Sequence, residues 1–201
     1  MKRTNGARDF FGELRLSPVI PAVRGPDGAL RDALSGPHAA VFVLGGDVFR
    51  VLERVEEAGQ RKRPAVCVNV DMVGGVSADA SGLRFLAGRV EGIISTHRHV
   101  VELAKGLGLV AIQRLFAIDS GAVERGTRLI GRADPHCVEI LPALALPEVL
   151  ATHPGLLERP VLAGGLLKSE DDVAALLAAG ASGVSTSFEG LWRPRALRRR
   201  H

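Results

Sequence analysis

Two charged side chains interrupt stretches of this chain that are otherwise apolar. Glu139 stands among β-branched residues, and Arg114 follows a short apolar run that ends at Gln113. An ionised side chain on a buried strand is costly unless it is paired or bound, so Glu139 needs a partner. One interpretation is a structural pair with Arg114 or Gln113. The other is a ligand site, in which Glu139 and Asp71 accept hydrogen bonds from hydroxyl groups while Arg114 or Lys168 offsets the charge of a phosphate.

Small residues gather at two later positions, in the strings Ala163-Gly164-Gly165 and Ser185-Thr186. Glycine lets the backbone N–H groups approach the oxygens of an anion, and hydroxyl groups add donors without bulk. If the two strings lie side by side, they predict a phosphate site.

Eight short runs, each nearly all apolar and rich in β-branched residues, must position these side chains. Such runs are typical of parallel strands that are buried on both faces. They span 19–22, 40–44, 65–70, 92–95, 109–113, 137–141, 161–163 and 183–185.

The segments between the runs have helical spacing. Val48, Val51, Leu52 and Val55 form one apolar stripe, and Ser169 opens another helix that should close at Gly180, where a left-handed residue is expected. Strands that alternate with helices predict an α/β fold, and eight of them favour a compact (β/α)8 TIM barrel over a doubly wound open sheet. The two small-residue strings support the barrel, because many barrels bind phosphate in the loops after strands seven and eight.

Several other chemistries are disfavoured. No GxGxxG string stands at a strand-to-helix junction, so a dinucleotide site is not expected. His97 and His99 lack a third ligand, because His136 should lie at the opposite end of the barrel, and no metal is predicted. Lys168 follows a glycine pair rather than lying on a buried strand, which disfavours Schiff-base chemistry. We predict no catalytic residue and no cofactor.

Composition places the charge at one end of the chain. The last nine residues contain five arginines and no acid; removing these five from the 26 Lys and Arg leaves 21, against 22 acidic residues.

We expect a flexible N-terminal segment over 1–17, one barrel domain over 18–192 and a basic tail over 193–201. Cys67 and Cys137 are expected to be reduced core thiols, and with no apolar segment long enough to span a membrane, we expect a cytoplasmic protein.

The order and spacing of five strings resemble the glycerol-3-phosphate-responsive antiterminator family, bacterial regulators of glycerol catabolism. The resemblance runs from about Ile20 to Trp192. The strings are Ile93-Ile94-Ser95-Thr96, Ala111-Ile112-Gln113-Arg114-Leu115-Phe116, Val138-Glu139-Ile140-Leu141-Pro142, Ala163-Gly164-Gly165 and Ser185-Thr186-Ser187.

This resemblance implies a barrel that senses glycerol 3-phosphate and acts on the leader mRNA of glycerol operons, preventing transcription termination. It implies that the phosphate is held by Gly164, Gly165, Ser185 and Thr186, and that Asp71, Arg114 and Glu139 face the glycerol end. The chain departs from the family pattern at several positions, among them His97 and Phe188, and the ligand could differ accordingly.

Three functions are compatible with these features. The first is a ligand-sensing, RNA-binding regulator, which could act as a homodimer. Its RNA contacts would depend on the arginine tail, because Phe42, Phe85 and Phe116 are expected in the core and Trp192 either stacks on RNA or caps the barrel floor. The second is a TIM-barrel enzyme acting on a small phosphorylated metabolite, with Asp71 or Glu139 as general base. The third is a binding protein that kept the pocket without acting on RNA.

Overall fold

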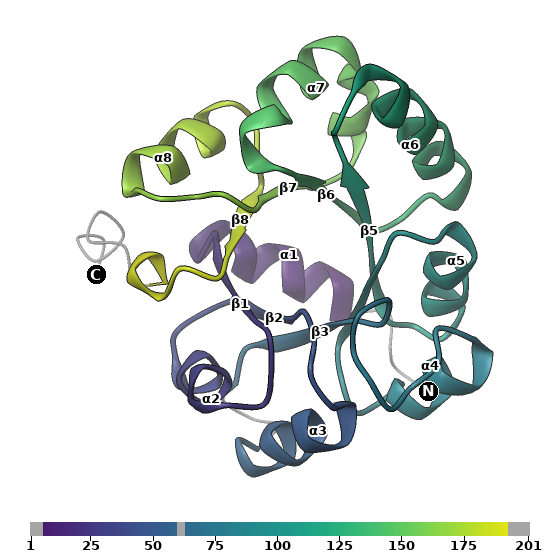
Figure 1. Cartoon of the computed structure of the whole chain (residues 1–201), viewed down its shortest axis with the longest axis vertical. Helices are drawn as coiled ribbons and strands as arrows, with labels where there is room; N and C mark the ends of the chain where they lie inside the picture. Colours follow the sequence, from purple (N-terminus) through teal and green to yellow (C-terminus); the bar gives the residue numbers. More distant parts are fainter. Residues whose placement is uncertain (1–5, 60–62, 193–201) are drawn as a thin grey trace.

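Eight parallel strands close into a barrel in the computed structural model, with helices around the outside (Figure 1). The structure describes residues 6–59 and 63–192. Each strand pairs with its neighbours in sequence, and β1 pairs with β8 to complete the ring. The strands are β1 (Val19–Val23), β2 (Ala40–Val43), β3 (Ala65–Asn69), β4 (Gly92–Ser95), β5 (Val110–Phe116), β6 (Cys137–Leu141), β7 (Val161–Gly164) and β8 (Gly183–Thr186). The predicted TIM barrel is confirmed.

The helices follow the predicted pattern. The apolar stripe of Val48, Val51, Leu52 and Val55 is buried, and Ser169 forms a reciprocal capping box with Asp172. Gly180 has a φ of 108°, the left-handed conformation expected after a helix. The α-helices are α1 (Gly6–Leu16), α2 (Gly28–Ser35), α3 (Val48–Glu57), α4 (Ala80–Leu86), α5 (Arg98–Gly106), α6 (Ser120–Ala133), α7 (Leu146–Thr152) and α8 (Glu170–Ala178), with 3-10 turns η1 (Ala143–Ala145), η2 (Pro154–Glu158) and η3 (Glu189–Leu191). None of the described helices is long and apolar enough to cross a membrane.

Side chains alternate between two cores along each strand. Valines such as Val41 and Val43 of β2 pack outward against the helices, whereas Phe42 and Cys67 belong to a separate cluster in the barrel interior. Cys67 and Cys137 are both free and fully buried there, and burial raises the pKa of each thiol well above its ordinary value. The prediction of two reduced core thiols is therefore confirmed.

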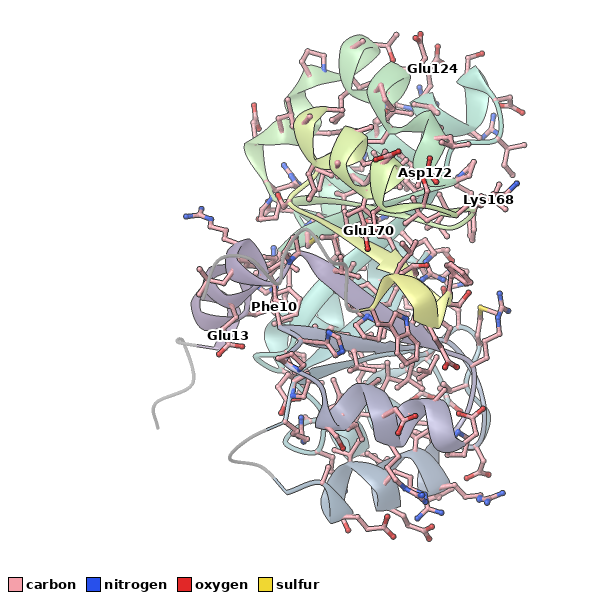
Figure 2. All side chains as sticks on the ribbon, turned by 90° about the vertical axis from the view of Figure 1, so that its left-hand side faces the viewer. Phe10, Glu13, Glu124, Lys168, Glu170 and Asp172 are labelled. Atoms are coloured by element: carbon pink, nitrogen blue, oxygen red, sulfur yellow. The ribbon has the colours of Figure 1, made fainter. Side chains whose placement is uncertain are left out.

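The N-terminal segment corrects one prediction. Residues 6–16 of the segment expected to be flexible form α1, which lies across the amino end of the barrel (Figure 1). Phe10 and Leu14 are buried in the interior cluster, and Leu14 reaches Gly183 at the start of β8. The helix forms because the open end of the barrel offers an apolar surface that its apolar face can cover. Figure 2 shows α1, with Phe10 labelled, on one side of the barrel and Lys168 on the other. The basic tail lies outside the described residues.

Two further expectations about aromatic side chains are wrong. Trp192 does not cap the barrel floor: its Nε1 donates to the backbone oxygen of Thr186 at 2.9 Å, at the carboxyl end of β8, and only 8% of it is exposed, so it is not available to stack on RNA. Phe116 is 45% exposed rather than in the core, because β5 continues through Arg114 to Phe116 and carries the ring beyond the barrel interior.

Replacing Leu14 by Ala tests whether α1 closes the barrel. We expect the free energy of unfolding to fall by about 2–5 kcal/mol, because the change leaves a cavity in the interior cluster. Leu16→Ala is the matched control, since Leu16 is 85% exposed, and should change stability by less than about 0.5 kcal/mol. Equal effects in urea denaturation would contradict this role for α1.

Candidate ligand site at the carboxyl end of the barrel

A buried ion pair joins β5 and β6. Arg114 and Glu139 are register partners in the two strands, and Nε and Nη2 of Arg114 each lie 2.7 Å from Oε2 of Glu139. The Arg114 side chain is 5% exposed and the Glu139 side chain is fully buried. Ser185 of β8 donates its hydroxyl proton to Oε1 of Glu139 at 2.5 Å. Glu139 therefore has the protein partner that its position required, and the alternative partner Gln113 is not part of this contact.

Gly164 of β7 makes room for this network. A Cβ at Gly164 would lie 2.5 Å from the Ser185 hydroxyl and 2.8 Å from Oε1 of Glu139, closer than real Cβ contacts. The glycine thus allows side chains from β6 and β8 to meet across β7. The ion pair uses Nε and Nη2 of Arg114, so the N–H groups of Nη1 are left outside it.

The loops after β7 and β8 lie side by side. Gly164 is the register partner of Ser185, so Gly165 and Thr186 follow as neighbours at the ends of adjacent strands. Gly165 has a φ of 80° and Leu166 a φ of 61°. A bulky residue in the left-handed region is unusual, and successive backbone N–H groups in a turn can point toward one anion. The two small-residue strings are together, as the sequence predicted.

Hydroxyl groups in these loops have local partners. The Ser185 proton is donated to Glu139, and the Thr186 hydroxyl accepts from the backbone N–H of Phe188 at 3.1 Å. The donors left for a phosphate at this point are therefore the backbone N–H groups and the Thr186 hydroxyl, which accepts from Phe188 but keeps its own proton.

Lys168 lies in the loop after β7 and is exposed (Figure 2). Its backbone N–H and that of Ser169 donate to Oδ2 of Asp172, each at 2.9 Å. These hydrogen bonds, with one from the Ser169 hydroxyl, lower the pKa of Asp172. The first turn of α8 is thus already capped by its own residues, which leaves the loop before it, rather than the helix end, as the place for an anion.

Asp71 is held to the next strand. Its Oδ1 accepts from the Ser95 hydroxyl at 2.6 Å, and its Oδ2 accepts from the backbone N–H and the hydroxyl of Thr96 at 2.7 and 2.8 Å. Oδ1 of Asn69 accepts a hydrogen bond from the backbone N–H of Asp71 at 3.1 Å. Asp71 lies at the same end of the barrel as Arg114, but β4 separates their strands. Sequence reasoning missed the role of Ser95 and Thr96; their position at the end of an apolar run was the available signal.

The histidines are placed as the sequence indicated. His97 and His99 are exposed at the carboxyl end, with ring centroids 5.8 Å apart. His136 precedes β6 at the opposite end, where its Nδ1 accepts from the backbone N–H of Ala111. Across residues 6–59 and 63–192, no three His, Cys, Asp or Glu side chains come together in a way that could hold a metal ion.

Comparison with known proteins identifies the family. The sequence profile described as "Glycerol-3-phosphate responsive antiterminator" matches residues 19–192. The chain belongs to this family. It is 30% identical over 184 residues to the uncharacterized protein YgcP of Escherichia coli, covering 89% of this chain and 93% of that protein.

Two solved structures share both fold and sequence with this chain. A glycerol uptake operon antiterminator regulatory protein from Listeria monocytogenes is 33% identical, with a TM-score of 0.78 over 87% of this chain and 94% of that chain. A glycerol uptake operon antiterminator-related protein from Thermotoga maritima is 30% identical, with a TM-score of 0.75 over 88% of this chain and 98% of that chain.

Replacing Glu139 by Gln tests the buried pair. We expect the free energy of unfolding to fall by about 3–5 kcal/mol, because the Arg114 charge would be buried without a counter-charge. The double variant Arg114→Met/Glu139→Leu should recover most of that loss, since two apolar side chains need no partner.

The matched control is Glu57→Gln, because Glu57 forms an exposed pair with Arg54 that should contribute little. If chemical denaturation showed that Glu139→Gln lowers the free energy of unfolding no more than Glu57→Gln does, the structure would not require the pair of Arg114 and Glu139.

Proposed function

We propose that this protein is a glycerol-3-phosphate-responsive antiterminator. In this proposal it binds glycerol 3-phosphate at the carboxyl end of the barrel, between β3 and β8, and, in that state, acts on leader mRNA so that transcription of glycerol metabolism genes is not terminated. Family membership supports the proposal, and the observation that carries it is the juxtaposition of the loops after β7 and β8, with left-handed Gly165 and Leu166 in the first of them. The proposal places the protein in the cytoplasm, where leader transcripts are made.

The phosphate is assigned to the loops after β7 and β8. Backbone N–H groups at Gly165 and Leu166 supply donors, and Gly164, Ser185 and Thr186 shape the loops around them. The amine of Lys168 supplies a positive charge from the same loop. In this assignment the Ser185 hydroxyl acts through Glu139, whereas the Thr186 hydroxyl keeps its own proton to donate to the phosphate.

The glycerol end is assigned to the side of β3 to β6. Arg114 donates from Nη1 to a ligand hydroxyl, while Glu139 holds its guanidinium group in place. Asp71 offers acceptor capacity at the end of β3. A ligand can shift a conformational equilibrium only through a difference in affinity between two states, so we infer that binding closes the loops after β7 and β8 relative to the free protein.

The enzyme alternative has less support from the same residues. Glu139 is paired with Arg114 and Ser185, which leaves it poorly suited to remove a proton from a substrate. Lys168 is exposed and lacks the apolar surroundings that favour Schiff-base formation. Prolonged incubation with glycerol 3-phosphate followed by NMR separates the two functions: an unchanged ligand spectrum agrees with a sensor, and turnover would establish an enzyme.

Thermal unfolding with added metabolites tests ligand binding. We expect glycerol 3-phosphate to raise the midpoint, with a stabilisation of about 2.7 kcal/mol at a concentration one hundred times the Kd, whereas glycerol alone should have no effect. Lys168→Ala should weaken the response, and Arg128→Ala, on an exposed position of α6, should leave it unchanged. An equal response to glycerol, or none to glycerol 3-phosphate, would overturn the ligand assignment.

Gel-shift titration with the leader transcript of a glycerol uptake operon tests the RNA step. Affinity should rise when glycerol 3-phosphate is added, because ligand and RNA favour the same state. Ligand binding without any RNA binding would instead support a protein that kept the pocket and lost the RNA function.

A further inference from the structure

Exposed apolar side chains are concentrated at the carboxyl end of the barrel. Ten large apolar side chains are exposed among the described residues, and seven of them lie at or after the carboxyl ends of strands. A gathering of exposed apolar side chains at one end of a molecule is a feature of contact sites, whereas singly scattered ones are ordinary. The seven are Phe49, Met72, Phe116, Ile118, Leu144, Leu166 and Phe188.

Five of these side chains form a continuous series over adjacent strands. Phe116 ends β5 and Ile118 follows it, Leu144 follows β6, Leu166 follows β7 and Phe188 follows β8. These four strands are hydrogen-bonded neighbours, and they also carry Arg114, Glu139, Gly164 and Ser185. We call the five residues the apolar arc. It borders the same end of the barrel as the proposed ligand site.

The two phenyl rings at the ends of the arc are suited to stacking. Phe116 is 45% exposed and Phe188 is 54% exposed. The Phe188 ring lies against Gly190, where a Cβ would come within 3.1 Å of it, and its backbone N–H is fixed by the Thr186 hydroxyl. Unpaired RNA bases are recognised mainly by stacking on aromatic side chains held in this way.

Charge favours RNA over a second copy of the chain as the occupant. Trp192 is anchored to Thr186 at this end of the barrel, and the nine residues that follow it in sequence contain five arginines and no acid. Nine residues can reach about 30 Å from Trp192, far enough to meet the backbone of an RNA on the arc. Two copies that met through this face would bring arginine-rich segments of like charge together, which is unfavourable.

We propose that unpaired bases of the leader RNA stack on Phe116 and Phe188, so that the RNA docks on the apolar arc directly over the ligand site. This inference rests on the proposed function. Leu166 belongs to both surfaces, since its backbone is assigned to the phosphate and its side chain to the arc. Ligand binding and RNA binding are therefore coupled through the loop after β7, and each strengthens the other by the same factor.

Substitutions of the two rings test the docking surface. Binding of a fluorescent leader transcript is measured in the presence of glycerol 3-phosphate for Phe116→Ala, Phe188→Ala and Phe188→Leu. Each is expected to weaken RNA binding about tenfold or more, because each removes a ring on which one base stacks. Phe188→Leu keeps the apolar character, so a loss in that variant identifies stacking. Phe188→Tyr keeps the ring and should retain affinity.

Leu157→Ala is the matched control. Leu157 is 52% exposed in η2, which precedes β7 and so lies at the other end of the barrel. The Leu157→Ala variant should bind RNA with the same affinity as the unsubstituted chain. All five variants alter exposed positions, so their thermal midpoints and their affinity for glycerol 3-phosphate should be unchanged.

Three outcomes would overturn the inference in different ways. If the unsubstituted chain binds no leader RNA, this inference and the RNA step of the proposed function both fail. If it binds RNA and the Phe variants match Leu157→Ala, the docking surface is wrong while the proposed function stands. If light scattering shows a dimer that the Phe variants dissociate without changing RNA affinity, the arc is a self-association surface.

Discussion

A carboxylate buried inside the barrel, Glu139, constrains the site around it. Its charge is tolerable only because Arg114 binds one oxygen and Ser185 donates to the other. The pair fixes the Arg114 guanidinium at the carboxyl end of β5, and the Ser185 contact brings β8 close enough that β7 can carry only glycine at position 164. Glu139, Gly164 and Ser185 look unrelated in the sequence. In the structure all three are needed for the same purpose, which is to bury the Glu139 carboxylate with its hydrogen-bond partners.

The two ends of the barrel differ in chemistry. The amino end is apolar and is closed by Phe10 and Leu14 of α1, so it needs no ligand. The carboxyl end carries charged and hydroxyl side chains, left-handed loop residues and the apolar arc. Such a division lets one end provide stability while the loops at the other end vary in function, which is general for this fold.

Much of the fold was predictable from the sequence because strands buried on both faces must be continuously apolar, and all eight were located in this way. The cost of a buried charge predicted that Glu139 has a partner, with Arg114 as one of the candidates, and the structure selects Arg114. Other features depend on contacts distant in sequence. Nothing local indicates that the Ser185 proton goes to Glu139, or that Asp71 is held by Ser95 and Thr96. Phe116 was misplaced because hydrophobicity does not reveal how far a strand extends past the barrel interior, and α1 was missed because its apolar face has a partner only once the barrel has closed.

A crystal structure of the protein grown with glycerol 3-phosphate is the most direct measurement of the central claim. The account requires the phosphorus atom to lie between the backbone of Gly165 and Leu166 and the turn that follows Thr186, with the glycerol carbons extending toward Arg114. A ligand bound on the outer helices, or a phosphate at the end of the barrel that α1 closes, would contradict it.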